Sequence, residues 1–315
     1  MIVMDLDTGL SSRENTIVAL GNFDGMHKGH QSLFQMCAQA HVRQGLMPAV
    51  LLFKNHTREA FRKNYKQLQS LQDKIETAGT FGIQTAFLLS FTEDIMQLSP
   101  EEFVDRILLE RCNASALVAG PNYTFGYRAR GDVQRLEQIG KLRRIDVRIA
   151  PEVTHNGAMI NSTTIRRAVS EGDMRTARTL LGTPYQIRGT VGPGKRRGRH
   201  LGFPTANLRL SFPYTLPPDG VYFTWARVGD KSYASLTNIG NNPTFEGADR
   251  KIETYIMDFT GDLYDMEIRL AFVEYFRPDI RFDHPEELIQ QMKRDEKEAR
   301  RLLTTLRLEG EELPN

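Results

Sequence analysis

Apolar residues in the first half of the chain form short runs that alternate with stretches of helical spacing. Each run is four or five residues long and rich in aliphatic side chains, as buried strands are; the runs lie at Ile17–Leu20, Ala49–Phe53, Ala86–Leu89, Ala116–Ala119 and Val147–Ala150. The helical stretches lie at about residues 31–44, 70–80, 100–111 and 132–142. This alternation predicts a Rossmann-like α/β domain, a parallel sheet covered by helices. Ligands of such sheets bind beyond the carboxyl ends of the strands.

The pattern changes near Gly182-Thr183-Pro184-Tyr185. Beyond it, segments rich in β-branched and aromatic residues are separated by glycine, proline and asparagine; they lie at Tyr185–Val191, Gly220–Val228, Lys231–Asn238, Lys251–Phe259 and Glu267–Tyr275. These segments predict an antiparallel β-barrel. From Pro285 to about Leu306, apolar residues at helical spacing among charges predict a C-terminal helix against the barrel. We therefore expect two domains, residues 1–183 and 184–315.

Composition narrows the partners and the compartment. The 315 residues include 41 cations and 39 anions, a net charge of +2 that indicates neither a nucleic-acid nor a membrane partner. No stretch approaches the roughly 18 apolar residues of a membrane span. Cys37 and Cys112 lie in segments typical of amphipathic helices, so we expect buried thiols in a reducing compartment. We expect a cytoplasmic protein, and its oligomeric state stays open.

The first candidate site directly follows the first predicted strand. The segment Gly21–His30 reads G-N-F-D-G-M-H-K-G-H and precedes a predicted helix. A strand, a glycine turn and a helix start form the geometry that binds phosphate. His27 and His30 are three residues apart, so in a first helical turn they project toward one side. H-x-G-H at this place is typical of nucleotidyltransferases, although several kinds of these enzymes and class I tRNA synthetases share it.

Two further segments belong to the same predicted edge of the sheet. Gly120–Gly126, G-P-N-Y-T-F-G, follows the fourth predicted strand and offers the Asn122 amide. Ser162 and Thr163 are typical of a helix start, and Arg166 follows one turn later. Together they offer an amide, two hydroxyls and a guanidinium to the phosphates bound by the glycine turn.

The second candidate site lies between Gly189 and Asn207, G-T-V-G-P-G-K-R-R-G-R-H-L-G-F-P-T-A-N. Its glycines allow close approach to an anion and its cations neutralise one; we expect phosphate contacts from Gly192, Gly194, Lys195, Arg199 and Gly202. The hydroxyl of Thr205 and the amide oxygen of Asn207 are hard ligands that suit Mg²⁺. The spacing is not that of a Walker loop.

These segments, in this order, resemble the bifunctional bacterial riboflavin kinase and FAD synthetase family over nearly the whole chain. The resemblance also includes Gly240–Phe245, Ile252-Glu253-Thr254 and Asn161–Arg166. It implies that the second domain phosphorylates riboflavin with ATP to give FMN. It implies that the first domain, an FMN adenylyltransferase, joins FMN to a second ATP to give FAD and pyrophosphate. ATP is then a co-substrate of both reactions, and Mg²⁺ is the expected cofactor.

The resemblance also implies roles for individual residues. Glu253 corresponds to the catalytic base of the kinase, and Thr205 and Asn207 to its Mg²⁺ ligands. His27, His30 and Arg166 correspond to groups that act on phosphates during adenylylation. The nucleotide is expected to contact Gly21, Phe23, Asp24, Gly25, Gly29, Asn122, Ser162 and Thr163. On residue chemistry alone, Glu253 also fits an ion partner of a lysine or arginine across the sheet.

One segment departs from the family pattern. Where many relatives have phenylalanine, an acid, proline and histidine, this chain has Phe53-Lys54-Asn55-His56-Thr57. Two alternatives therefore stay open: a riboflavin kinase whose first domain has decayed, and a flavin- or RNA-binding regulatory protein that uses the basic loop 195–200. Products formed from riboflavin, ATP and Mg²⁺ distinguish them, because FAD requires two activities and FMN requires one.

Overall fold

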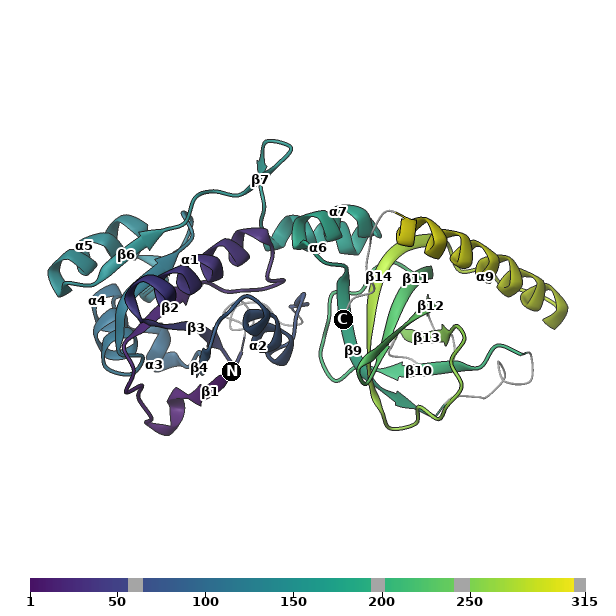
Figure 1. Cartoon of the computed structure of the whole chain (residues 1–315), viewed down its shortest axis with the longest axis horizontal. Helices are drawn as coiled ribbons and strands as arrows, with labels where there is room; N and C mark the ends of the chain where they lie inside the picture. Colours follow the sequence, from purple (N-terminus) through teal and green to yellow (C-terminus); the bar gives the residue numbers. More distant parts are fainter. Residues whose placement is uncertain (56–64, 194–201, 241–249, 309–315) are drawn as a thin grey trace. The chain divides into compact units, whose positions relative to one another are not determined.

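We describe the fold from a computed structural model of the chain (Figure 1), in which residues 1–55, 65–193, 202–240 and 250–308 are described. The chain divides into two compact units, Met1–Ser162 and Thr163–Asn315. The second unit begins with the two helices that precede the barrel. The functional boundary after residue 183 stays a prediction.

The first unit is built on a six-stranded parallel sheet with the order β1-β4-β3-β2-β5-β6. Its strands are β1 (Ile2–Asp5), β2 (Thr16–Leu20), β3 (Met47–Phe53), β4 (Thr85–Leu89), β5 (Ala114–Ala119) and β6 (Asp146–Ile149). Five of these match the predicted strands. β1 was not predicted, because it is an edge strand whose Ile2 and Val3 are 59% and 50% exposed and carry no alternating pattern. The strand order reverses between β2 and β5, and ligands of open α/β sheets bind at such a reversal.

Helices cover both faces of this sheet. The elements between the strands are η1 (Leu6–Thr8), α1 (Lys28–Gln44), α2 (Leu71–Thr80), α3 (Glu93–Met96), α4 (Pro100–Glu102), the π-helical η2 (Phe103–Leu109), η3 (Tyr127–Ala129) and α5 (Val133–Arg143). A small hairpin, β7 (Thr154–His155) and β8 (Ala158–Met159), follows the last strand of the sheet. Ile17 and Ala19 pack with α1 and α2, whereas Val18 and Leu20 pack with η2 and α5. Burial on both faces explains the continuous apolar runs of the sequence.

The second unit begins with α6 (Ser162–Glu171) and α7 (Met174–Leu181), the latter packed on two barrel strands. The barrel is closed and antiparallel, with the order β10-β13-β12-β11-β14-β9. Its elements are β9 (Tyr185–Gly192), β10 (Thr205–Arg209), β11 (Gly220–Val228), β12 (Lys231–Gly240), β13 (Lys251–Ile256), β14 (Glu267–Arg277) and the terminal α9 (Pro285–Leu308). The predicted fold class, an α/β domain followed by an antiparallel barrel and a C-terminal helix, is confirmed.

The two faces of the barrel wall have different chemistry. On the outer face, Phe223 and Trp225 pack with Ala299 and Leu306 of α9, which Figure 1 shows in yellow beside the strands. The inner face carries a chain of hydroxyl hydrogen bonds that joins Thr254, Thr237, Thr224 and Ser235, all fully buried. Because each of these hydroxyls has a partner, burying this network costs little free energy of folding.

Candidate active sites

The turn between β2 and α1 is strained. Phe23 and Met26 have φ values of 48° and 42°, and Gly25 has a φ of 91°. Left-handed backbone is unfavourable for phenylalanine and methionine, and such residues collect at functional sites. The fully buried Phe23 ring packs under Gly21, where a Cβ atom would lie only 3.1 Å from it. The turn therefore has one tightly packed shape, which sets the direction in which α1 begins.

His27 and His30 form a stacked pair at the start of α1. Their ring centroids are 3.7 Å apart with an angle of 21° between the planes, and the Phe23 ring lies 5.0 Å from His30. Gly29 leaves room for this pair, because a Cβ atom there would stand 3.1 Å from His27 Nδ1. His27 is the N-cap residue, yet its side chain makes no capping hydrogen bond. The first amide groups of α1 are therefore open to an anion from outside the helix.

Both imidazoles are held in the neutral form at pH 7. Burial lowers the pKa of His27 to about 4 although the nearby Asp24 carboxylate opposes this change. Burial also lowers the pKa of His30, and so do repulsion from His27 when that ring is protonated and repulsion from the Lys74 ammonium. Within the described residues, both Nδ1 atoms are buried without a hydrogen-bond partner. Unsatisfied buried nitrogens are costly, and they are expected where a ligand completes the site.

Asp24 joins the turn to two other segments. Its Oδ1 accepts a hydrogen bond of 2.8 Å from the Leu68 backbone N–H, and its carbonyl oxygen accepts one of 2.8 Å from Ser162 Oγ. Asp24 is 1% exposed, so these contacts hold the turn from within. Its predicted contact with the nucleotide stays a prediction.

The segments expected at the carboxyl ends of β2 and β5 do converge. The Asn122 amide donates to Met159 Sδ at 3.0 Å, and the Ile160 carbonyl oxygen lies 3.9 Å from the place of a Cβ atom at Gly29. Residues 159–162 thus join the loop after β5 to the turn after β2. Thr163 is exposed, and Arg166 follows Ser162 by one turn on the same face of α6.

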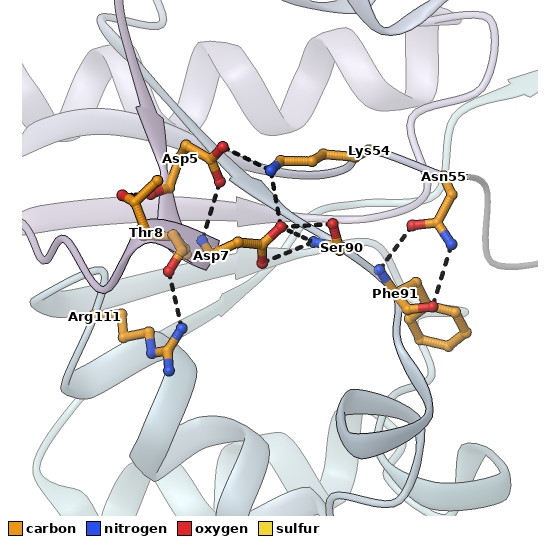
Figure 2. Close-up of polar contacts among 9 residues, drawn as sticks. Asp5, Asp7, Thr8, Lys54, Asn55, Ser90, Phe91 and Arg111 are labelled. Carbon is orange, nitrogen blue, oxygen red and sulfur yellow. Dashed lines mark hydrogen bonds and ion pairs between the residues drawn. The ribbon is translucent and has the colours of Figure 1, made fainter.

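The segment that departs from the family pattern is held by ion pairs. Lys54 Nζ lies 2.6 Å from Asp5 Oδ2 and 2.8 Å from Asp7 Oδ2, so it joins the ends of β1 and β3 (Figure 2). Asp7 also accepts a hydrogen bond from Ser90 Oγ at 2.5 Å, and Asn55 binds both backbone polar groups of Phe91. The lysine that stands in place of the acid of the family pattern is therefore paired with two carboxylates, those of Asp5 and Asp7. His56 and Thr57 lie outside the described residues.

We expect Lys54→Glu, which restores the acid of the family pattern, to lower the unfolding midpoint by roughly 3–5 °C. Lys54→Glu would place a third carboxylate beside those of Asp5 and Asp7, whereas Lys54→Met leaves only these two and should have a smaller effect.

The ion pair also makes stability depend on pH. Burial raises the pKa of Asp7, but hydrogen bonds from Lys54 and Ser90 outweigh this effect and lower the pKa below 3.8. The advantage of wild type over Lys54→Met is thus present above pH 4 and lost as the pH falls below it. Calorimetry from pH 3 to 8 measures this, and equal midpoints at pH 7 would contradict it.

The kinase candidates lie in one row across the outer face of the barrel. Strand register places Gly192, Asn207, Glu253 and Asn238 side by side on β9, β10, β13 and β12. Directly opposed residues share a face of the sheet, and Thr205 joins this face two positions before Asn207. A carboxylate, a hydroxyl and two amides are thus gathered in one patch.

Glu253 also has an ion partner. Its carboxylate pairs with the Lys251 ammonium, two residues away on the same strand, and both side chains are about a third exposed. The sequence left this interpretation open beside that of a catalytic base, and the two are compatible because the carboxylate stays accessible. Its role as the base stays a prediction.

Comparison with known proteins places both units in known families. The family model for FAD synthetase matches residues 10–164, and the one for riboflavin kinase matches residues 181–303. The chain is 37% identical over 296 residues to the bifunctional riboflavin kinase/FMN adenylyltransferase of Listeria monocytogenes, covering 93% of this chain and 94% of that one. The enzyme of the same name from Bacillus subtilis is 33% identical over 300 residues, with coverage of 93% and 94%. The chain belongs to this family.

A crystal structure of a protein from Streptococcus pneumoniae matches this chain over both units. That protein, named a macrolide-efflux protein, has a TM-score of 0.87 and 30% identity, with coverage of 95% of this chain and 99% of that one. In the part of the chain that the structure describes, no helix has the length and apolar character needed to cross a membrane.

The sequence did not predict two residues that lie on this patch of the riboflavin kinase unit. The Arg209 side chain lies against Gly192, on the same face as Asn207, and Asn238 has a buried amide oxygen without a hydrogen-bond partner among the described residues. No motif marks either residue, because only strand register brings them to the patch. Gly202 has a left-handed φ of 82°, which favours glycine. Gly194, Lys195 and Arg199, and most of Gly240–Phe245, lie outside the described residues.

The donor set of the patch suits Mg²⁺. Thr205 and Asn207 offer two neutral, hard oxygens on one face of β10. Among the described residues there is no group of three histidine, cysteine or acidic side chains that could hold a metal ion. Mg²⁺ keeps several waters and is often bound by one or two side chains together with substrate phosphates. The residues present therefore fit an ion that enters with ATP.

Proposed function

We propose that this enzyme makes FAD in two steps, phosphorylating riboflavin to FMN and then adenylating FMN. The observation that carries the proposal is that both units keep their candidate chemistry: a stacked histidine pair at an uncapped helix start, and a carboxylate in register with an amide and beside a hydroxyl. A decayed first unit has no reason to keep two imidazoles stacked with unsatisfied nitrogens. ATP is the co-substrate of both steps.

In the kinase step, Glu253 accepts the proton of the ribityl 5′-hydroxyl of riboflavin. The oxygen of that hydroxyl forms a bond to the γ-phosphorus of ATP. The bond from that phosphorus to the β,γ-bridging oxygen breaks, and ADP leaves. Most of the rate enhancement in such reactions comes from alignment and charge neutralisation. Thr205 and Asn207 would hold Mg²⁺, which neutralises phosphate charge when bound.

In the adenylylation step, the FMN phosphate attacks the α-phosphorus of the second ATP and pyrophosphate leaves. The nucleophile is already an anion at neutral pH, so the step requires no strong base. His27 and His30 donate hydrogen bonds to the phosphates as charge builds on them. Ser162, Thr163 and Arg166 bind the same phosphates, and Asn122 orients a substrate.

Product analysis tests this proposal. The protein is incubated with riboflavin, ATP and Mg²⁺, and the flavins are separated by chromatography. FAD supports both activities. FMN alone would identify a kinase with a decayed first unit, and unchanged riboflavin would favour a binding protein. FMN supplied directly with ATP tests the second activity alone.

We expect Thr205→Val to abolish most kinase turnover and to raise the Mg²⁺ concentration needed for what remains. The substitution nearly preserves volume but removes one of the two hard oxygens. A Mg²⁺ titration of FMN formation measures the effect, with adenylylation of supplied FMN as the internal control. An unchanged titration curve would show that the hydroxyl is structural.

We place the enzyme in the cytoplasm. Both cysteines are free and buried, and burial raises the pKa of the Cys37 thiol to about 12. A protonated, buried thiol reacts slowly, which suits a structural cysteine in a reducing compartment.

A further inference from the structure

A lysine of α2 is buried on the face of the sheet that also carries α1 and its histidine pair. Lys74 is only 4% exposed and stands at the end of the first turn of α2, where its ammonium lies 3.5 Å from Gln67 Oε1. Lysine is rarely buried to this degree, because removing its charge from water is costly. Neither the glycine turn nor the residues after β5 include this residue, so it falls outside the motifs that identify the family here.

Lys74 adds positive charge to the face of the sheet on which α1 begins. The amino end of a helix carries partial positive charge, and Lys74 lies within the first turn of α2. The start of α1, which lies on the same face of the sheet, has no side-chain cap. The positive charge of Lys74 also acts on His30, where it helps to keep the ring neutral. The uncapped start of α1, two imidazoles and an ammonium together suit an anion.

The lysine and the histidines belong to one framework. Asp24, which precedes the histidines in the turn, binds the Leu68 backbone N–H at 2.8 Å. Leu68 is adjacent to Gln67, the residue that contacts Lys74. The capping box of Ser70 and Asp73 then fixes the start of α2. The segment that contacts Lys74 is therefore tied to the glycine turn.

We propose that Lys74 is a phosphate-binding residue of the adenylylation site, whose ammonium neutralises the polyphosphate of ATP at the start of α1. The proposal rests on the adenylylation proposed above. ATP brings several negative charges, and more charge builds on the pyrophosphate as it leaves. An ammonium fixed beforehand in a partly dry site stabilises that charge without reorganisation. Lys74 thus supplies the positive charge that the neutral histidines cannot.

The test compares Lys74→Met, which keeps length and burial without the charge, with Lys74→Arg, which keeps the charge. We expect Lys74→Met to lower the rate of FAD formation from FMN and ATP by about 10²–10³-fold. We expect titration calorimetry to show at least tenfold weaker binding of inorganic pyrophosphate to the full chain. Lys74→Arg should recover most of the pyrophosphate affinity. Lys141→Met, at an exposed lysine of α5, is the matched control and should behave as wild type.

Riboflavin phosphorylation in the same molecule reports on folding. If Lys74→Met binds pyrophosphate as wild type does, or makes FAD within threefold of the wild-type rate, the proposal is wrong. If Lys74→Arg loses pyrophosphate affinity as completely as Lys74→Met, the lysine is structural and the proposal is also wrong. Failure of the proposed function looks different, because wild type itself would then make no FAD from FMN.

Discussion

We expect His30→Ala to stop FAD synthesis while riboflavin is still phosphorylated, so that FMN accumulates as the end product. His30 lies in the first turn of α1, stacked on His27, with a buried Nδ1 that has no partner among the described residues. Removing one donor aimed at developing phosphate charge costs about 10²–10³ in rate. Chromatography of the flavins formed from riboflavin and ATP measures the ratio of FMN to FAD.

The reverse reaction provides an independent measurement. FAD and pyrophosphate should return FMN and ATP more slowly by a similar factor, because both directions share one transition state. His41→Ala, at the other end of α1, is the matched control, since it removes an imidazole that hydrogen-bonds the Leu46 carbonyl near the end of the helix, away from the phosphate site. A folded His30→Ala variant that makes FAD near the wild-type rate would assign the chemistry of the first unit to other residues.

Glu253→Gln should have the opposite effect, with FMN formation falling by about 10²–10⁴-fold and adenylylation of supplied FMN unchanged. Glutamine keeps the shape of the side chain and its place opposite Asn207, but it cannot accept the proton of the ribityl hydroxyl. The two activities lie in different units, so the loss should stay within the kinase. Initial rates with riboflavin and with FMN, measured on the same preparation, give both numbers.

The ion pair with Lys251 offers a control for this prediction. Lys251→Met removes the partner and leaves the Glu253 carboxylate. If Glu253 acted only as an ion partner, Lys251→Met would lower kinase activity as much as Glu253→Gln does. We expect Lys251→Met to keep kinase activity within about tenfold of wild type, because the base remains. Glu274→Gln, on β14, breaks an ion pair with Arg175 of α7 and should leave both activities intact. Kinase activity of Glu253→Gln within tenfold of wild type would remove Glu253 from the mechanism.

The sequence predicts the parallel sheet well because burial on both faces leaves an unambiguous pattern. Ile17–Leu20 is wholly apolar and its residues pack alternately on two helical layers. The histidine site is also predictable, because the turn and the helix start are adjacent in sequence. β10 is not, since Thr205–Arg209 is short and follows a glycine-rich loop that predicts no strand.

Contacts between distant segments are what the sequence does not show. Lys54 and Asp5 are 49 residues apart, and nothing local indicates that the lysine replaces an acid beside two carboxylates. Asn238 meets Glu253 only through the register of two strands. Lys74 has the spacing of an ordinary helical lysine, which predicts a solvated side chain until the tertiary structure buries it.

The glycine at position 29 changes what an H-x-G-H pattern means. Gly29 lies within α1 and is not among the residues of positive φ, so the backbone there does not need glycine's freedom. Glycine fits here because it has no side chain: the His27 ring takes up the space beside position 29 while it stacks on His30. The pattern thus describes two stacked rings and the gap that admits one of them, rather than two histidines with a flexible spacer. A chain with alanine at the third position keeps both imidazoles, yet we infer that its His27 ring would have to shift by a few tenths of an ångström, so the two patterns differ in geometry.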